Sequence, residues 1–357
     1  MSLINDLISI VGADHVLQGD EAAPYLTDWR GRFTGRAQAV VRPANTQEIA
    51  EVVKLCARYE VPMVTQGGNT GLCGGATPSN KGDAVLILTT RLNHILNVDT
   101  VNDTITVQAG CILQQVQEAA AKQDRLFPLS LGAEGSCTIG GNLATNAGGT
   151  QVLRYGNARD LVLGVEVVTP EGEILNGLRG LRKDNTGYDL RNLYVGSEGT
   201  LGIITAATLK LYPQPVAECT ALVAFETLED ALYMLNYARK GFGSKLEGFE
   251  LMSDYCLKIV NECFPEQTLP LSLDYPWYAL IQMADSDSEE QARDTFQRVL
   301  ESAFEDDIIQ DAVLAESLQQ ANDLWHMRES IPLAEAIVGQ GIKNDISVPI
   351  SRIAPFG

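Results

Sequence analysis

The feature that most limits how this chain can fold is a loop in which half of the residues are glycine. Five glycines fall among the ten residues 66–75, QGGNTGLCGG. Glycine lets backbone N–H groups approach anionic oxygens closely and adopts positive φ without strain, so such loops commonly hold phosphate groups. Taken alone, the loop fits a bulge or a tight turn equally well.

The residues before this loop predict an α/β beginning. A strand is expected at 37–41, and a second strand at 61–65 leads directly into the glycines. Between them, Asn45 and Glu48 form an Asn version of the capping box. Apolar residues then recur at helical spacing, which predicts an amphipathic helix that covers a sheet.

Two familiar phosphate-binding loops are excluded by their spacing. The P-loop places a Lys directly after its last glycine, and no Lys follows Gly71, Gly74 or Gly75. The dinucleotide fingerprint requires G-x-G-x-x-G at the start of a helix. The loop lacks that spacing, and Pro78 lies just downstream.

Two further glycine-rich segments follow, at 127–156 and 195–205. In the first of them, small hydroxyl and amide side chains lie between the glycines and can bond a ligand in a narrow channel. The second reads VGSEGTLGIIT. Three separated loops of this kind, with apolar strands between them, indicate one long ligand with many oxygens, because a mononucleotide would need only one loop.

The charge and cysteine content disfavour several classes of partner and site. Asp and Glu number 46 against 26 Lys and Arg, a formal net charge of -20, and no Lys/Arg cluster offsets it. Nucleic acid and anionic membrane surfaces would be repelled. The seven cysteines include no C-x-x-C pair, which disfavours a zinc knuckle and a disulfide framework. Free thiols are typical of a reducing compartment, and the sequence shows no signal peptide and no long apolar run, so we expect a cytoplasmic protein.

The length of the chain, 357 residues, suits two domains. Pro213 and Pro215 mark the predicted boundary, which gives domains 1–213 and 214–357. Beyond it glycine becomes rarer and charge increases, and strand and helix patterns predict a second α+β unit. Its last predicted helix spans about 314–336.

In combination, the glycine-rich motifs carry a family resemblance. PMVTQGGNTGLCGG, GSCTIGGNLATNAGG and KDNTGYDLRNLYVGSEGTLGIIT occur in that order. Together they resemble the vanillyl-alcohol-oxidase-type flavoproteins, and most closely the group of D-2-hydroxyglutarate and D-lactate dehydrogenases that includes glycolate-oxidase-subunit-D-like proteins. The resemblance implies an α+β fold, with a two-subdomain FAD-binding domain of the p-cresol-methylhydroxylase (PCMH) type followed by an α+β substrate (cap) domain.

The resemblance also implies an activity. Such enzymes oxidise a D-2-hydroxy acid, such as 2-hydroxyglutarate or lactate, to the 2-oxo acid by hydride transfer to flavin N5. Electrons then pass to a separate acceptor, an electron-transfer flavoprotein or a quinone, and a homodimer is compatible with the resemblance. The alternative is a flavin-binding subunit, or a truncated remnant, without full catalytic activity.

Positions in the motifs imply which residues bind FAD. They are Gln66, Gly67, Gly68, Asn69, Thr70, Gly71, Leu72, Gly132, Ser136, Thr138, Gly140, Gly141, Asn142, Thr145, Gly199 and Ile203. Related flavoproteins often attach FAD through a His in the first glycine loop, but here the histidines are His15, His94 and His326. We therefore expect non-covalent FAD. Cys137 is the one cysteine that offers an alternative attachment, although a small buried apolar role suits it better.

The substrate side is expected in segment 322–349. An Arg fork matches the two oxygens of a carboxylate, and a Lys adds a point charge. This segment resembles the family's W-x-x-R-E helix and K-x-D strand, which implies that Arg328 and Lys343 bind the substrate carboxylate. From the residues alone, Arg328 fits an ion pair with a nearby acid better. Pro332 stands where the 2-hydroxyglutarate enzymes have a substrate-contacting Thr, and this departure leaves room for lactate, glycolate or malate.

Two weaker expectations complete the site. Lys183 and Asn185 are substrate-site candidates, since in the family their loop approaches the flavin ring; a turn is the alternative. The family's catalytic base and its metal-binding His and Glu residues follow the K-x-D strand, so we expect them beyond Gly357. The chain as given is thus predicted to hold no catalytic base and no metal ligand, and a divalent metal such as Zn is expected only with that tail.

Overall fold

The computed structural model describes residues 2–339, 341 and 346–356. The chain forms two compact units: Met1–Gly149 with Gly156–Pro213, and Thr150–Tyr155 with Gln214–Gly357. Residues 150–155, here called the inserted segment, therefore belong to the second unit, although the chain on either side of them belongs to the first. Among the helices of the described residues, none combines the length and the apolar character that a bilayer crossing requires.

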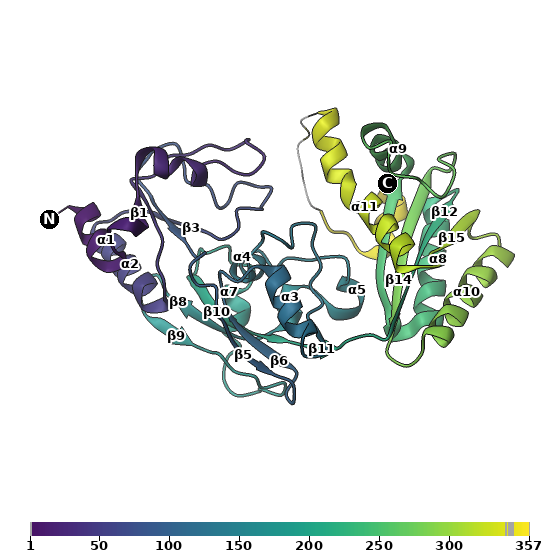
Figure 1. The fold of residues 1–357 in the computed structure, drawn as a ribbon, viewed down its shortest axis with the longest axis horizontal. Coiled ribbons are helices and arrows are strands. Elements are labelled where there is room, and N and C mark those ends of the chain that lie inside the picture. The colour runs from purple at the N-terminus through teal and green to yellow at the C-terminus, as the bar shows by residue number, and fades with distance from the viewer. Residues whose placement is uncertain (1, 340, 342–345, 357) are drawn as a thin grey trace. The chain divides into compact units, whose positions relative to one another are not determined.

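The first unit begins with a four-stranded sheet (Figure 1). In spatial order its strands are β1 (Val16–Leu17), β2 (Ala39–Val41), β4 (Val85–Leu88) and β3 (Met63–Gln66). β2 and β3 run parallel to β4, and β1 pairs antiparallel with β2. Because β3 ends at Gln66, it delivers the chain directly into the first glycine-rich loop.

Two helices, α1 (Leu3–Val11) and α2 (Thr46–Arg58), pack against this sheet. Asn45 caps α2 as predicted: its side chain accepts the Glu48 N–H at 2.9 Å. The Glu48 carboxylate accepts the N–H of Ala44, one residue before the cap, at 2.7 Å, where a capping box would use the N–H of Asn45. The apolar face of α2 is buried, as its periodicity predicted. Val168 and Ile203, from the second sheet of this unit, belong to the same core cluster.

A five-stranded antiparallel sheet forms the second half of this unit. Its order is β5 (Ile95–Asp99), β6 (Thr104–Gln108), β10 (Ile203–Lys210), β8 (Val162–Val168) and β9 (Ile174–Asn176). The remaining elements are α3 (Leu113–Ala121), α4 (Ile139–Ala144), α6 (Ala158–Leu161), α7 (Arg191–Tyr194) and the short pair β7 (Arg125–Leu126) and β11 (Tyr212–Pro213).

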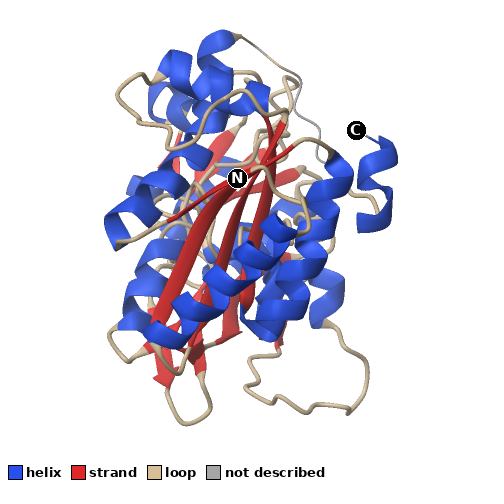
Figure 2. Ribbon diagram, turned by 90° about the vertical axis from the view of Figure 1, so that its right-hand side faces the viewer, coloured by secondary structure: helices blue, strands red, loops and turns tan. Residues whose placement is uncertain are grey.

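The second unit is an antiparallel sheet with helices on both faces (Figures 1 and 2). The strand order is β13 (Leu246–Ser253), β14 (Trp277–Asp285), β12 (Ala217–Phe225) and β15 (Asp311–Leu314). One face packs against α8 (Leu228–Phe242) and α10 (Glu289–Glu305). The other face packs against α9 (Asp254–Cys263) and α11 (Leu318–Val338). The inserted segment contains α5 (Val152–Tyr155), and α12 (Ile353–Phe356) lies near the end of the chain.

The helix predicted at about 314–336 begins later than expected. Strand β15 occupies Asp311–Leu314, and α11 starts at Leu318 after Ser317, whose hydroxyl accepts the Gln320 N–H at 3.2 Å. The sequence pattern missed β15 because its four residues are all half-buried and lack a clear alternation. Arg328 and Pro332 both lie inside α11.

Candidate functional site: three converging glycine loops and an arginine on α11

The first and second glycine-rich segments touch within the first unit. A Cβ added at Gly67 would lie 2.2 Å from Thr138 Oγ1, and one added at Gly68 would lie 2.0 Å from the carbonyl oxygen of Ser136. Both separations are far shorter than any van der Waals contact. Only glycine therefore allows the two loops to approach this closely.

The third glycine-rich segment joins the same place. The N–H of Gly196 donates to the carbonyl of Leu143 at 2.9 Å, and the N–H of Glu198 donates to that of Ala144 at 2.9 Å. A Cβ added at Gly199, where φ is +76°, would lie 2.8 Å from Thr65 Oγ1. The three motifs, distant in sequence, therefore form one continuous structure at the end of β3 and around α4.

Arg159 fastens the second segment to the third, a role that no sequence pattern indicates. Its main-chain N–H donates to Asn146 Oδ1 at 3.0 Å. Its guanidinium donates to the carbonyl of Val195 at 2.5 Å and to that of Asn192 at 2.8 Å. Arg159 lies in α6, and a single charged residue there has no distinguishing pattern in the sequence, so only the fold reveals this contact.

Backbone strain gathers in these loops. Asn69 and Asn146 adopt positive φ, at 53° and 48°, and Glu198 does so at 51°. Each of the three glycine-rich segments thus holds one non-glycine residue in the left-handed region. Strained residues of this kind cluster at ligand-binding sites, where the surrounding structure fixes them.

Several of the predicted cofactor residues use their side chains to hold the loops. The buried Gln66 amide donates to the carbonyls of Tyr25 and Ala76, at 3.0 and 2.9 Å. Asn69 donates to the carbonyl of Thr27 at 2.9 Å, and Thr145 donates to that of Gly141 at 3.0 Å. These side chains shape the loops, which leaves ligand contact to other groups.

Three positions have the properties of a ligand site. Thr138 Oγ1 is buried and has no hydrogen-bond partner among the described residues, although Thr138 precedes the first turn of α4. A Cβ added at Gly71 or at Gly132 would meet no atom within 4 Å. An unpaired buried hydroxyl needs an explanation in a native structure, and a bound polar ligand supplies one. These loops fit a long, oxygen-rich cofactor.

The other predicted cofactor residues lie in or beside the same loops, in varied environments. Thr70, Leu72 and Gly141 are half-buried, and Ser136 is exposed. A Cβ added at Gly140 would lie 2.7 Å from that of Ala109, so this glycine permits close packing of α4. Ile203 is buried in a core cluster of the first unit.

Cys137 is a buried thiol beside these loops. Burial raises its pKa, and the hydrogen bond from the Asn142 amide, at 3.5 Å, opposes that rise. A thiol with a raised pKa is a poor nucleophile. Cys137 is therefore unsuited to covalent attachment of a cofactor.

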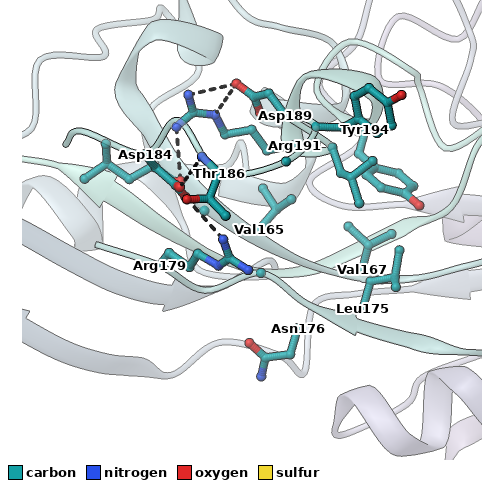
Figure 3. Close-up of a pocket in the computed structure, with 16 residues that line it drawn as sticks. Val165, Val167, Leu175, Asn176, Arg179, Asp184, Thr186, Asp189, Arg191 and Tyr194 are labelled. Atoms are coloured by element: carbon teal, nitrogen blue, oxygen red, sulfur yellow. Dashed lines mark hydrogen bonds and ion pairs between the residues drawn. The ribbon is translucent and has the colours of Figure 1, made fainter. Parts of the chain in front are cut away.

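A separate pocket of about 370 Å³ lies between β8, β9 and the loop before α7 (Figure 3). Its apolar lining includes Val165 and Val167. Two arginines also line it, but each faces an acid: Arg179 with Asp184 at 3.3 Å, and Arg191 with Asp189 at 3.0 Å. The pocket carries balanced charge and offers no free anion clamp.

The two weaker substrate candidates lie next to this pocket without lining it. Asp184 and Thr186 line the pocket, whereas Lys183 and Asn185, which alternate with them, do not and are exposed to solvent.

In the second unit, Arg328 on α11 forms an ion pair with Glu250 on β13. Its Nε donates to Glu250 Oε2 at 2.8 Å, and a terminal nitrogen lies 2.5 Å from the same oxygen. The two side chains keep 32% and 22% of their exposure, so the pair is half-buried. A guanidinium carries five N–H donors, which leaves Arg328 with the capacity to bind a second carboxylate.

Pro332 alters the helix beside Arg328. In an α-helix the N–H of residue 332 would donate to the carbonyl of residue 328, and proline has no N–H. The main-chain carbonyl of Arg328 therefore lacks its helical donor. Lys343, the second predicted carboxylate ligand, lies outside the described residues.

Metal ligands are not gathered anywhere in the described part of the chain. No group of three or more His, Cys, Asp or Glu side chains there could hold an ion. His326, one of the three histidines, is exposed on α11.

Comparison with known families identifies both halves of the chain. Residues 37–177 match a family model described as an FAD binding domain, and residues 214–356 match one described as the C-terminal domain of FAD linked oxidases. The crystal structure of p-cresol methylhydroxylase with substrate bound has the same fold, with a TM-score of 0.71 at 18% identity over 96% of this chain and 69% of that one. The predicted α+β fold of the PCMH type and the FAD cofactor are confirmed.

Two curated relatives are similar along nearly the whole chain. A D-2-hydroxyglutarate dehydrogenase of Xanthomonas citri pv. viticola is 39% identical over 332 residues, 93% of this chain and 68% of the relative. A probable mitochondrial D-2-hydroxyglutarate dehydrogenase of Oryza sativa subsp. indica is 37% identical over 350 residues. That match covers 97% of this chain but only 62% of the length of the rice protein.

The predicted cytoplasmic location is wrong by this comparison. The rice relative is named as mitochondrial, and so are the relatives from cattle and Arabidopsis thaliana. The prediction rested on the lack of a signal peptide and on free cysteines, and neither feature separates the two compartments.

Proposed function

Because this chain belongs to the FAD-linked oxidase family, among relatives named D-2-hydroxyglutarate dehydrogenases, we propose that it oxidises a D-2-hydroxy acid to the 2-oxo acid. The observation that carries the proposal is Arg328, a half-buried cation with N–H groups to spare in the domain that follows the FAD-binding domain. D-2-hydroxyglutarate is the first candidate substrate, and lactate, glycolate and malate follow it. Electrons would leave to a separate acceptor, an electron-transfer flavoprotein or a quinone.

The residues of the first unit would hold the cofactor. The main chain at Gly71 and Gly132 has the space for it, and the Thr138 hydroxyl has a free hydrogen bond to give or accept. Bound FAD supplies the two-electron acceptor that amino-acid side chains lack. The glycine-rich loops would bring its phosphates close to backbone N–H groups, which stabilise anionic oxygens.

The residues of the second unit would bind and orient the acid. Arg328 would fix the substrate carboxylate through paired N–H groups, the geometry in which an Arg fork binds most strongly. Glu250 would hold the guanidinium in one orientation through Nε and a terminal nitrogen. A carboxylate held in this way supplies one of the three contacts that an enzyme needs to distinguish D from L acids at C2.

The proposal predicts that D-2-hydroxy acids reduce the bound flavin. The FAD-loaded chain is titrated without oxygen with the D and L forms of 2-hydroxyglutarate, malate and lactate, and with glycolate, while the visible flavin band is followed. We expect a D acid to bleach the band and its L form to leave it unchanged. A band that no acid bleaches would contradict the proposal and favour a flavin-binding subunit without this activity.

A further inference from the structure

A bulge in β13 directs Glu247 to one face of the second sheet. Leu246 pairs with Met283 and Gly248 pairs with Gln282, so Glu247 is the extra residue between two registered pairs. Leu246 and Phe249 both pack in the core beneath α8 and α10. Glu247 and Gly248 therefore both belong to the opposite face, the one on which α11 lies.

The carboxylate of Glu247 is fully buried and accepts hydrogen bonds from the inserted segment 150–155. Its Oε1 accepts from Arg154 at 3.0 Å and from the Tyr155 hydroxyl at 3.1 Å. Its Oε2 accepts from Gln151 at 3.4 Å and from Gln282 of β14 at 3.3 Å. Three of these four donors come from the inserted segment, and Arg154 also donates to the carbonyl of Ala284 on β14 at 3.0 Å. Glu247 thus makes most of the side-chain hydrogen bonds that hold the segment on the sheet.

Burial of the Glu247 carboxylate carries a desolvation cost. Burial raises the pKa of Glu247, as does the neighbouring Glu218 carboxylate, while Arg154 and the hydrogen bonds from Tyr155 and Gln151 lower it. Buried ion pairs are weak stabilisers, and well-packed apolar residues in their place are often at least as stable. The arrangement is better explained by the fixed geometry that it imposes than by stability.

The inserted segment is flanked by two glycines, Gly149 and Gly156, that both adopt positive φ. Gly149 has φ +134° and Gly156 has φ +77°. A Cβ at Gly149 would lie 2.5 Å from the carbonyl oxygen of Ser130, and a Cβ at Gly156 would lie 2.3 Å from Asp160 Oδ2. Both ends are tight turns, and the segment between them is held on the second sheet by Glu247 and by the carbonyl of Ala284, which accepts from Arg154 at 3.0 Å.

The inserted segment lies beside the helix that carries Arg328. A Cβ added at Gly248 would lie 3.1 Å from the carbonyl oxygen of Thr150 and 3.6 Å from the ring of Trp325. Trp325 is one helical turn before Arg328 on α11, and Glu250, the partner of Arg328, follows Gly248 on β13. The same seam between β13 and α11 thus holds the inserted segment and the Arg328–Glu250 pair.

We propose that Glu247 is a positioning residue for the substrate site. By holding residues 150–155 on β13 it sets the place of Thr150, whose carbonyl faces Gly248 next to Trp325, one helical turn before Arg328 on α11. The role assigned to Glu247 lies within the second unit, to which residues 150–155, β13 and α11 all belong. This inference rests on the proposed function, because it assigns Glu247 to the site that binds the acid.

The test compares Glu247→Gln with the wild-type chain, both loaded with FAD. The amide keeps the shape of the side chain but removes the negative charge that pairs with Arg154. We expect faster hydrogen–deuterium exchange at the amides of 150–155, and an affinity for D-2-hydroxyglutarate, measured from anaerobic flavin bleaching, that is weaker by about tenfold. FAD affinity and the limiting rate at saturating acid should stay within about twofold. Lys245→Met, which breaks the 2.6 Å pair with the buried Asp285 of the same sheet, is the matched control and should change neither readout.

The other outcomes overturn either the inference or the proposed function on which it rests. Unchanged exchange at 150–155 in Glu247→Gln would show that Glu247 does not hold the segment. Faster exchange with unchanged acid affinity would show that the segment has no part in the substrate site, as would an equal loss in Lys245→Met. A wild-type flavin that no acid bleaches contradicts the proposed function itself, and the exchange comparison then decides alone whether Glu247 holds the segment.

Discussion

Gly68→Ala is expected to abolish tight FAD binding and to destabilise the first unit. The added Cβ would lie 2.0 Å from the carbonyl oxygen of Ser136, so the first two glycine-rich loops must move apart. Overpacking of this kind costs about 1–3 kcal/mol of unfolding free energy. Displaced loops should also weaken FAD binding by roughly a hundredfold, or about 2.8 kcal/mol. Thermal unfolding of the apoprotein and titration with FAD measure the two effects.

Gly71→Ala separates the cofactor from the fold. Its Cβ would meet no protein atom within 4 Å, so the unfolding free energy of the apoprotein should change by less than about 1 kcal/mol. The methyl group would occupy space that we assign to FAD, so FAD binding should weaken all the same. Gly339→Ala, which adds a methyl to equally open space in the second unit, should leave both quantities unchanged. Wild-type FAD affinity in Gly68→Ala would contradict this assignment of the site.

Arg328→Met is expected to remove the response to hydroxy acids while FAD stays bound. Loss of a paired, partly buried charge contact costs about 2–5 kcal/mol, which corresponds to a fall in acid affinity of roughly thirtyfold to several thousandfold. Anaerobic bleaching of the flavin band measures this loss. Arg293→Met, which breaks an exposed pair at 3.9 Å with Glu316, should leave the titration unchanged.

Glu250→Gln distinguishes a substrate ligand from a structural ion pair. If Arg328 serves only to pair with Glu250, the two variants should have the same effect. If Arg328 binds the acid, Glu250→Gln keeps the guanidinium and should retain most of the acid affinity, whereas Arg328→Met should lose it. Equal and small effects of both variants would contradict the assignment of Arg328.

Local sequence patterns predicted much of the fold of the first unit. The Asn45 and Glu48 cap placed the start of α2, and the glycine spacing located the loops that meet around Thr138. Those features depend on residues close together in sequence, or on a residue type that only one backbone conformation or close approach explains. The family resemblance then supplied the order of the domains and the identity of the cofactor.

The remaining features of the site depend on contacts between residues far apart in sequence, and no local sequence pattern predicts such contacts. Glu250 reads as an ordinary charged strand residue, yet it holds Arg328. Glu247 reads as exposed and is fully buried, because a bulge that the sequence does not signal turns it inward. The inserted segment lies within a glycine-rich stretch whose other residues belong to the first unit, and its contacts with Glu247 and Ala284 assign it to the second.

The most direct test of the proposed reaction compares D-2-hydroxyglutarate with the same acid carrying deuterium at C2, in rapid anaerobic mixing with the FAD-loaded chain. If Arg328 holds the acid so that hydrogen leaves C2 for the flavin, the band should bleach several times more slowly with the deuterated acid. Equal bleaching rates would show that transfer from C2 does not limit the observed step. No bleaching with either acid would contradict the account, since the chain would then bind FAD without oxidising this substrate.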